Sequence, residues 1–149
     1  MHIRPAAAGD AKAIIHIWHR GWHEAHADLV PTEILAYRRP DNFLAWWKEA
    51  TERFFVAASG AEPVGFVSLK GCEVVKLYVG SDARGTGVAS ALLDFAERTL
   101  AQDGTSEAEL LCTAGNVRAE RFYLRQGWRL TDTFDDALWT PAGVTPTFI

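Results

Sequence analysis

The chain reads Arg84-Gly85-Thr86-Gly87-Val88-Ala89 where an apolar segment gives way to an amphipathic one. Residues 74–79 carry Lys76 as their only charge, and their β-branched and aromatic side chains predict a largely buried strand. From Val88 onward, apolar residues recur at helical spacing. Gly85 and Gly87 allow backbone N–H groups to approach a ligand closely, and a helix N-terminus adds partial positive charge. The stretch therefore predicts a site for a phosphate or pyrophosphate.

Two other kinds of phosphate loop do not fit. A nucleotide-hydrolase loop needs Gly-Lys followed by Ser or Thr, and the chain has no such run. A dinucleotide-binding loop needs a small residue of the Gly or Ala type at position 90, where this chain has Ser90. That loop also belongs to the first strand–helix unit of a parallel sheet, whereas this one follows segments that indicate an antiparallel hairpin. A tight turn without a ligand stays open as the alternative.

The loop and the segments around it resemble the GNAT superfamily of acetyl-CoA-dependent N-acetyltransferases. The loop of that family reads Arg or Gln, two residues, Gly, one residue, then Gly or Ala, and residues 84–89 fit every defined position. Further matches follow in chain order over almost the whole chain: Ile3-Arg4 with Asp10, Val64-Gly65-Phe66-Val67, Asn116, Ala119, Phe122-Tyr123 and Gly127-Trp128. The resemblance implies an α/β (α+β) GNAT fold. Its central sheet is mixed, mostly antiparallel, splayed at the core strands and flanked by helices.

Periodicity and turn residues predict a single domain over residues 1–149. Strands are expected at 3–5, 54–58, 64–70, 73–79, 107–113 and 128–134, with a last strand ending at Phe148-Ile149. Helices are expected from Asp10, as the cap, to Arg20, and at 41–51, 88–102 and 116–126. Gly21 and Pro31 predict a bent or split helix over 22–37.

Composition excludes several classes of protein. The 149 residues are 48% hydrophobic, which is enough for one substantial core. The 15 Lys and Arg against 19 Asp and Glu form no basic cluster, so nucleic acid is not an expected partner. No apolar run reaches the roughly 18 to 20 residues of a membrane span, and Met1 leads into a strand rather than a signal peptide. We expect a cytoplasmic protein without a membrane partner, with Cys72 and Cys112 as reduced core thiols. A homodimer is left open.

The resemblance assigns roles around an acetyl-CoA co-substrate. Arg84 to Ala89 would hold its pyrophosphate, and the pantetheine arm would pair with the backbone of Leu77, Tyr78 and Val79 as an added strand does. A backbone N–H of this strand would hold the oxyanion. Asn116 would bond the pantetheine, although helix capping also explains an Asn there. Tyr123 matches the residue that protonates the CoA thiolate in many members, with a core tyrosine as the alternative.

The amine acceptor needs a base, because an alkyl ammonium has a pKa near ~10.4. Glu73 begins the core strand at the offset where several GNAT enzymes keep a glutamate base. We therefore assign Glu73 as the candidate base, with a solvated carboxylate at a strand end as the alternative.

Histidines and tryptophans gather between positions 16 and 47. His16, His19, His23 and His26 fall in one helical sector, and His19 and His23 have the i, i+4 spacing of zinc ligands. Because Gly21 is expected to interrupt the helix and no His-Glu-x-x-His motif occurs, we predict no metal site. In GNAT enzymes this region covers the acceptor site. The candidate acceptor-binding residues are Trp22, His26, Trp46 and Trp47, with core packing as the alternative reading of these aromatic residues.

The sequence thus predicts an N-acetyltransferase that transfers an acetyl group from acetyl-CoA to a primary amine by direct attack in a ternary complex. One rival is a catalytically silent module that binds or senses acyl-CoA, which would keep residues 84–89 but tolerate the loss of Tyr123 and Glu73. A second rival is a nucleotide-binding α/β protein. The variable first helices leave the acceptor undetermined.

Overall fold

Four antiparallel strands form the main sheet in the order β1-β2-β3-β4. The computed structural model describes residues 1–133, 135–140 and 143–148, with side chains described for 1–133. The strands are β1 (His2–Pro5), β2 (Arg53–Ser59), β3 (Glu62–Lys70) and β4 (Glu73–Val79), and a separate antiparallel pair is formed by β5 (Asp135–Thr140) and β6 (Gly143–Phe148). The helices are α1 (Ala11–His26), α2 (Pro40–Glu49), α3 (Val88–Gln102) and α4 (Val117–Arg125). Three short 3₁₀ helices are η1 (Ala8–Asp10), η2 (Thr32–Tyr37) and η3 (Ser81–Ala83).

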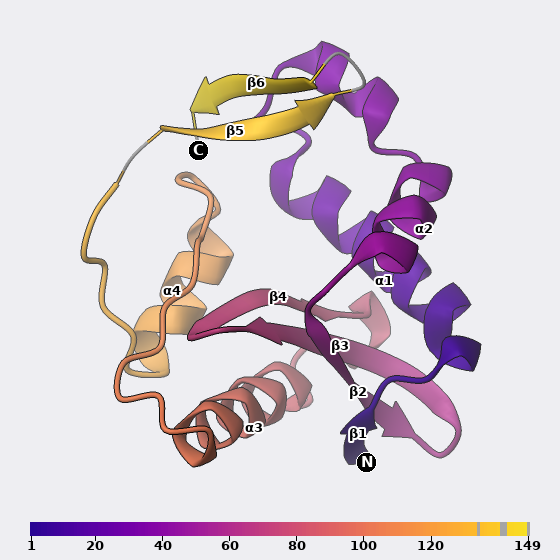
Figure 1. The fold of residues 1–149 in the computed structure, drawn as a ribbon, viewed down its shortest axis with the longest axis vertical. Helices are drawn as coiled ribbons and strands as arrows, with labels where there is room; N and C mark the ends of the chain where they lie inside the picture. The colour runs from indigo at the N-terminus through magenta and orange to yellow at the C-terminus, as the bar shows by residue number, and fades with distance from the viewer. Residues whose placement is uncertain (134, 141–142, 149) are drawn as a thin grey trace.

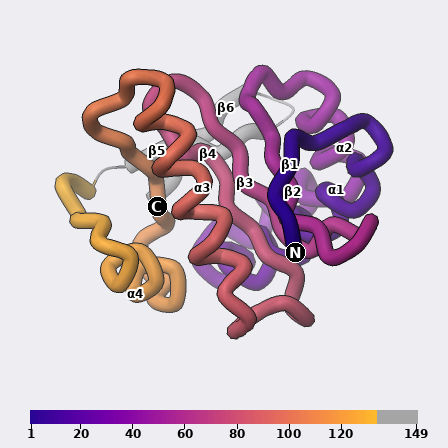
Figure 2. Tube along the Cα trace, turned by 90° about the horizontal axis from the view of Figure 1, so that it is seen from below, coloured from indigo at the N-terminus to yellow at the C-terminus, as the bar shows by residue number. Residues whose placement is uncertain are grey.

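Helices cover both faces of the main sheet. Helices α1 and α2 lie on one face and α3 on the other (Figure 1). Figure 2, seen from below, shows α4 on the β4 side of the sheet and α2 on the opposite side, beside β1 and β2. The order and the antiparallel pairing confirm the predicted α/β architecture with a mostly antiparallel sheet and flanking helices.

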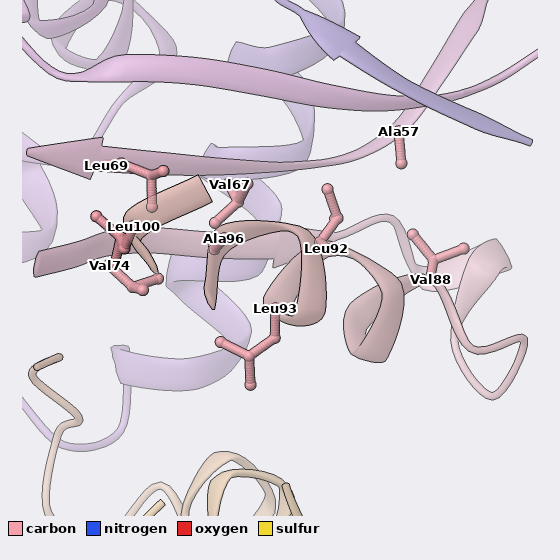
Figure 3. Close-up of a cluster of buried hydrophobic side chains, with 9 residues drawn as sticks. All are labelled: Ala57, Val67, Leu69, Val74, Val88, Leu92, Leu93, Ala96 and Leu100. Atoms are coloured by element: carbon pink, nitrogen blue, oxygen red, sulfur yellow. The ribbon is translucent and has the colours of Figure 1, made fainter. Parts of the chain in front are cut away.

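The face under α3 is an aliphatic core. The helical spacing of its apolar residues places Leu92 and Ala96 against the strands, and Leu93 projects from the other side of the helix, as Figure 3 shows. Full burial of a leucine contributes about 1.5–3 kcal/mol relative to an exposed one, so this core anchors α3 firmly. The buried residues are Ala57, Val67, Leu69, Val74, Val88, Leu92, Leu93, Ala96 and Leu100.

The face under α1 and α2 is an aromatic core. The ring of Trp18 meets Phe43 edge-on with centroids 4.9 Å apart, and lies 6.4 Å from Phe66. Phe66 stacks on Tyr78 of β4 at 5.7 Å. These contacts join α1 and α2 to the middle of the sheet, and edge-on and offset arrangements are the favoured geometries of aromatic pairs.

The predicted interruption of the first helix at Gly21 is wrong. Helix α1 runs unbroken from Ala11 to His26, and the irregular segment starts only at Ala27. A Cβ atom on Gly21 would lie 2.5 Å from the Cδ1 atom of Tyr78. Glycine at this position therefore permits close packing of α1 on the Tyr78 ring. The predicted split between helices lies instead at 27–31, between the end of α1 and the start of η2.

The predicted strands at 107–113 and 128–134 are also not formed, within the described residues. Only Glu109 bridges β4, in parallel to Glu73, with Val74 N donating to Glu109 O at 2.9 Å. Trp128 N donates to Tyr123 O at 2.9 Å and so belongs to the turn that ends α4, where Gly127 has a φ of +92°. The remaining predicted strands and helices are present with small differences in their bounds. The last strand ends at Phe148, and residues 134 and 149 lie outside the described residues.

Two local predictions need correction. The carboxylate of Asp10 does not cap α1; it accepts hydrogen bonds from Arg4 at 2.7 and 2.9 Å and from Ala7 N at 2.8 Å. The Arg4 guanidinium holds the pKa of Asp10 below its ordinary value, and this pair ties β1 to the start of α1. Cys72 is a free thiol but is exposed at the β3–β4 turn, not in the core, whereas Cys112 is free and half-buried. In the described part of the chain, no helix has the length and apolarity needed to cross a membrane.

Candidate functional site

A cavity of about 490 Å³ lies between β4, the start of α3, the segment 111–113 and α4. It is lined by every residue predicted to bind the cofactor except Thr86, and His26 of α1 lies at its wall. The structure thus brings together segments that are up to about a hundred positions apart in the sequence.

The loop that the sequence singled out has a left-handed backbone at both glycines. Gly85 has a φ of +77° and Gly87 a φ of +86°, and the space beside both is open. Gly87 begins α3, because its carbonyl accepts the first helical hydrogen bond from Ala91 N at 3.0 Å. The N–H groups of the first helical turn have no acceptor within the helix, so they are available to an anion. The Thr86 hydroxyl donates to Ala83 O and steadies the loop from outside the cavity.

Arg84 connects the loop to α1. Its guanidinium forms a hydrogen-bonded ion pair with Glu24. The hydrogen bond from Arg84 is the main cause that lowers the pKa of Glu24, and Arg118 and Arg20 contribute through their charges. The positive charge of Arg84, the first residue of the loop motif, is therefore partly neutralised by Glu24.

One edge of β4 faces the cavity. Strand β3 pairs with β4 on one side, and on the other side the described residues make only the bridge between Glu73 and Glu109. The segment after Glu109 leaves this edge, and the cavity opens beside Leu77, Tyr78 and Val79. An open strand edge offers N–H and C=O groups to an extended ligand.

Two tyrosines line the cavity. Tyr123 lies on α4, with its ring edge-on to Phe122 at 5.4 Å and to Trp128 at 6.4 Å. Burial is the main cause that raises the pKa of Tyr123 above its ordinary value, and Cys112 adds to it. Burial likewise raises the pKa of Tyr78, with a contribution from Tyr123. Both phenols therefore keep their protons at neutral pH.

Asn116 and Glu73 have different positions relative to the cavity. The Asn116 side chain caps α4 by accepting from Ala119 N at 3.4 Å, and Asn116 also lines the cavity. Glu73, half-buried at the start of β4, does not line it, whereas Val74 to Val79 do. The structure does not bring Glu73 and Tyr123 into the same cavity wall.

The predicted acceptor residues lie on the aromatic side of the sheet. His26 Nδ1 donates to Trp22 O at 3.1 Å, and their rings lie 5.2 Å apart. Burial lowers the pKa of His26, with a smaller contribution from Arg38. Trp22, Trp46 and Trp47 pack against the aromatic core and do not line the cavity itself.

Sequence reasoning missed a buried cation in this region. Arg38 is only 4% exposed, and its guanidinium lies 5.3 Å from the ring centre of Trp22 and 5.0 Å from that of Trp46. Burial lowers the pKa of Arg38. Cation–π contacts of this kind fix the relative positions of the two tryptophans. No local pattern around Arg38 signals them, because Trp22 and Trp46 come from different helices.

Lys76 and two arginines of α4 were also missed as lining residues. Lys76 pairs with Glu52, which also accepts from the Ser68 hydroxyl at 3.1 Å. Arg118 and Arg125 line the cavity from α4. Their i, i+7 spacing puts them on one face of the helix, and this is the signal that points to them.

The histidine sector makes backbone contacts. His23 Nδ1 donates to His19 O at 2.9 Å, and the rings of His19 and His23 lie 4.4 Å apart. Among the residues that the structure describes, no group of three or more His, Cys, Asp or Glu is placed to hold a metal ion.

Comparison with known proteins identifies the class to which this fold and cavity belong. The model of the acetyltransferase (GNAT) family matches residues 12–128. The chain belongs to this family of acetyltransferases. No curated protein sequence matches it significantly.

Solved structures share the fold at low sequence identity. A GCN5-related N-acetyltransferase from Rhodopseudomonas palustris is 22% identical, with a TM-score of 0.74 over 97% of this chain and 90% of that one. The PaiA N-acetyltransferase of Thermoplasma acidophilum, solved with coenzyme A, is 17% identical, with a TM-score of 0.67 over 97% and 95%. A ribosomal-protein-alanine N-acetyltransferase from Brucella melitensis is 19% identical, with a TM-score of 0.70 over 91% and 88%. At these identities the similarity establishes the fold.

Proposed function

We propose that this chain is an N-acetyltransferase that uses acetyl-CoA and transfers its acetyl group directly to a primary amine in a ternary complex. The observation that carries the proposal is the single cavity that joins the glycine loop, the open edge of β4 and Tyr123. A phosphate site, a binding edge for an extended chain and a proton donor are the parts that this transfer needs.

Binding uses backbone groups of the chain. The N–H groups of Gly87 to Ala89, at the start of α3, receive the pyrophosphate. The edge of β4 at Leu77 to Val79 pairs with the pantetheine arm, as an added strand would. Asn116 stands on the opposite wall, where its amide nitrogen donates to the same arm while its oxygen caps α4.

The transfer step needs three groups. The amine nitrogen attacks the thioester carbon, and an N–H of Leu77 to Val79 stabilises the negative charge that forms on the carbonyl oxygen. The C–S bond then breaks as the carbonyl re-forms, Tyr123 donates its proton to the departing thiolate, and the proton that the nitrogen loses on becoming an amide returns to the tyrosinate. Burial keeps the phenol protonated, since it raises the pKa of Tyr123.

Supply of free amine is the second requirement. An alkyl ammonium has a pKa of about 10.4, so only about one alkyl amine in 2,500 is unprotonated at pH 7. This scarcity of free amine adds about 4.6 kcal/mol to the apparent barrier. Glu73 takes this proton through water, because it stands at the start of β4 and outside the cavity wall. The acceptor enters from the side of Trp22 and His26, with Trp46 and Trp47 supporting that wall.

Isothermal titration against acetyl-CoA, CoA and ATP tests the proposed ligand. Acetyl-CoA and CoA should bind in a 1:1 ratio, and ATP should bind at least about tenfold more weakly, because it lacks the pantetheine arm that pairs with β4. Tighter binding of ATP would favour a nucleotide-binding protein instead.

A thiol-release screen over a library of amines tests the transfer. At least one primary amine should accelerate CoA release, and the acceleration should be lost in Tyr123→Phe. Tight binding of acetyl-CoA with no amine-dependent release from any class of amine would identify a catalytically silent acyl-CoA-binding module.

A further inference from the structure

The charged residues that line the cavity, within the described part of the chain, are all positive. Among its described lining residues are four cations, Lys76, Arg84, Arg118 and Arg125, and no carboxylate. The chain as a whole carries a net charge of −4, so this concentration of positive charge is local. A cavity of this kind attracts a ligand with several negative charges.

Two of the four cations already have partners within the protein. Lys76 pairs with Glu52, and Arg84 pairs with Glu24. Arg118 and Arg125 are exposed, and neither makes a hydrogen bond or a salt bridge within the part of the chain that the structure describes. The charge of Arg118 extends far enough across the cavity to help lower the pKa of Glu24 on α1. These two guanidinium groups are therefore the ones available to a ligand.

Both arginines line the cavity from one side of α4. They are seven positions apart, which places them on the same helical face about 10 Å apart along the axis. Gln126, the residue after Arg125, donates from Nε2 to the Ser90 hydroxyl at 3.0 Å, and Ser90 is in the first turn of α3. The hydrogen bond fixes the end of α4 beside the helix start that is proposed to hold the pyrophosphate.

We infer that Arg118 and Arg125 form a second phosphate site at the rim of the cavity, which binds the 3′-phosphate of the CoA ribose. The inference rests on the proposed function, in which the N–H groups of residues 87–89 hold the pyrophosphate. A phosphate monoester is the remaining dense negative charge on that ligand, carrying about −1.5 to −2 at neutral pH. Its oxygens match the paired N–H groups of a guanidinium.

Comparison of acetyl-CoA with acetyl-dephospho-CoA, which lacks only the 3′-phosphate, tests this site by calorimetry. The wild-type protein should bind acetyl-CoA about tenfold more tightly at low ionic strength, and the preference should shrink as salt screens these exposed charges. Arg125→Gln and Arg118→Gln should each reduce the preference, and the double variant should bind both ligands equally. Affinity for acetyl-dephospho-CoA should stay near the wild-type value throughout.

Arg121→Gln is the matched control, because Arg121 is exposed on the same helix but does not line the cavity. It removes the same charge and should leave the preference unchanged. Equal affinity of the wild-type protein for the two ligands, or a preference that survives the double variant, would overturn the second phosphate site while leaving the proposed function intact. Failure of the wild-type protein to bind either ligand would overturn both.

Discussion

The two sides of the cavity are built in opposite ways. On the side of the glycine loop, contiguous residues form the site, their backbone has left-handed glycines, and open space surrounds them. On the side of α1, Gly21, Ala25 and His26 line the cavity, and the adjoining aromatic core is built from large side chains of separate helices, with Arg38 against Trp22 and Trp46. A site made of backbone N–H groups is encoded by a short motif, whereas a wall made of side chains depends on how distant elements pack. The two sides should therefore respond differently to substitution.

The largest effect is expected at Tyr123, the proposed proton donor. Tyr123→Phe should lower kcat by about 10² to 10⁴, because the proposed proton donation matters only on the way through the transition state. Affinity for acetyl-CoA should change little. Steady-state kinetics and calorimetry measure the two quantities, with Tyr37→Phe as a control, since Tyr37 lies outside the cavity lining. A wild-type kcat in Tyr123→Phe would show that Tyr123 is not the proton donor.

Glu73 tests whether a carboxylate outside the cavity takes part in the reaction. Glu73→Gln should lower the rate at neutral pH by about 10², and the rate should recover as the pH rises toward the pKa of the amine itself. The measurement is the rate as a function of pH at saturating acetyl-CoA. Glu49→Gln removes an exposed carboxylate from the end of α2 and should leave the profile as in wild type. An unchanged pH–rate profile for Glu73→Gln would show that Glu73 is not the base.

Gly87 tests the loop as a phosphate site. Gly87→Val should weaken acetyl-CoA binding at least about tenfold, because its branched side chain enters the space beside the N–H groups. The variant is also strained by its φ of +86°. Gly104→Val is the matched control, since Gly104 has a φ of +92° and equally open surroundings but lies beyond the end of α3. Calorimetry should show weak binding for Gly87→Val alone, and equal affinities in the two folded variants would contradict the placement.

Gly21 tests the packing on the aromatic side. Gly21→Ala should destabilise the protein by about 1–3 kcal/mol, because the new methyl group meets the Tyr78 ring in a packed region. Gly9→Ala, where nothing lies within 4 Å of the added atom, should be close to neutral. Urea unfolding of the two variants gives the comparison. A Gly21→Ala protein as stable as Gly9→Ala would show that α1 does not press on Tyr78.

The smallest effect is a pH dependence that originates at His26. Burial lowers the pKa of His26 in the folded state, so below about pH 6.5 the unfolded chain binds a proton that the folded chain does not. The free energy of unfolding should therefore decrease as the pH falls through this range. His26→Gln should flatten the decrease between about pH 8 and about pH 5, measured by urea unfolding. An equal dependence of the unfolding free energy on pH in the two proteins would show that His26 is not its source.

The antiparallel strands, α3 and the glycine loop were predictable because each has a local cause. Alternating β-branched residues favour strands, a 3.6-residue apolar period favours α3, and only glycine adopts the φ values of Gly85 and Gly87 easily. Apart from Thr86, the predicted cofactor residues meet in one cavity, where Asn116 and Tyr123 of α4 join those that flank the edge of β4 and the start of α3.

Other features were decided by tertiary contacts. The low helix propensity of glycine predicts a helix break at Gly21. In the structure, the ring of Tyr78, more than fifty residues later, packs where a Cβ atom of residue 21 would lie. Residues 110–113 have the composition of a strand, yet the chain leaves β4 after Glu109 and the cavity opens in its place. The sequence by itself determined the family through its motifs, and it determined the antiparallel strands, α3 and the glycine loop through periodicity and through backbone conformations that few residues adopt. Only the tertiary structure decided the packing of the aromatic core, the position of Arg38 and the ion pair of Arg84 with Glu24, because these depend on distances between side chains that no local pattern records.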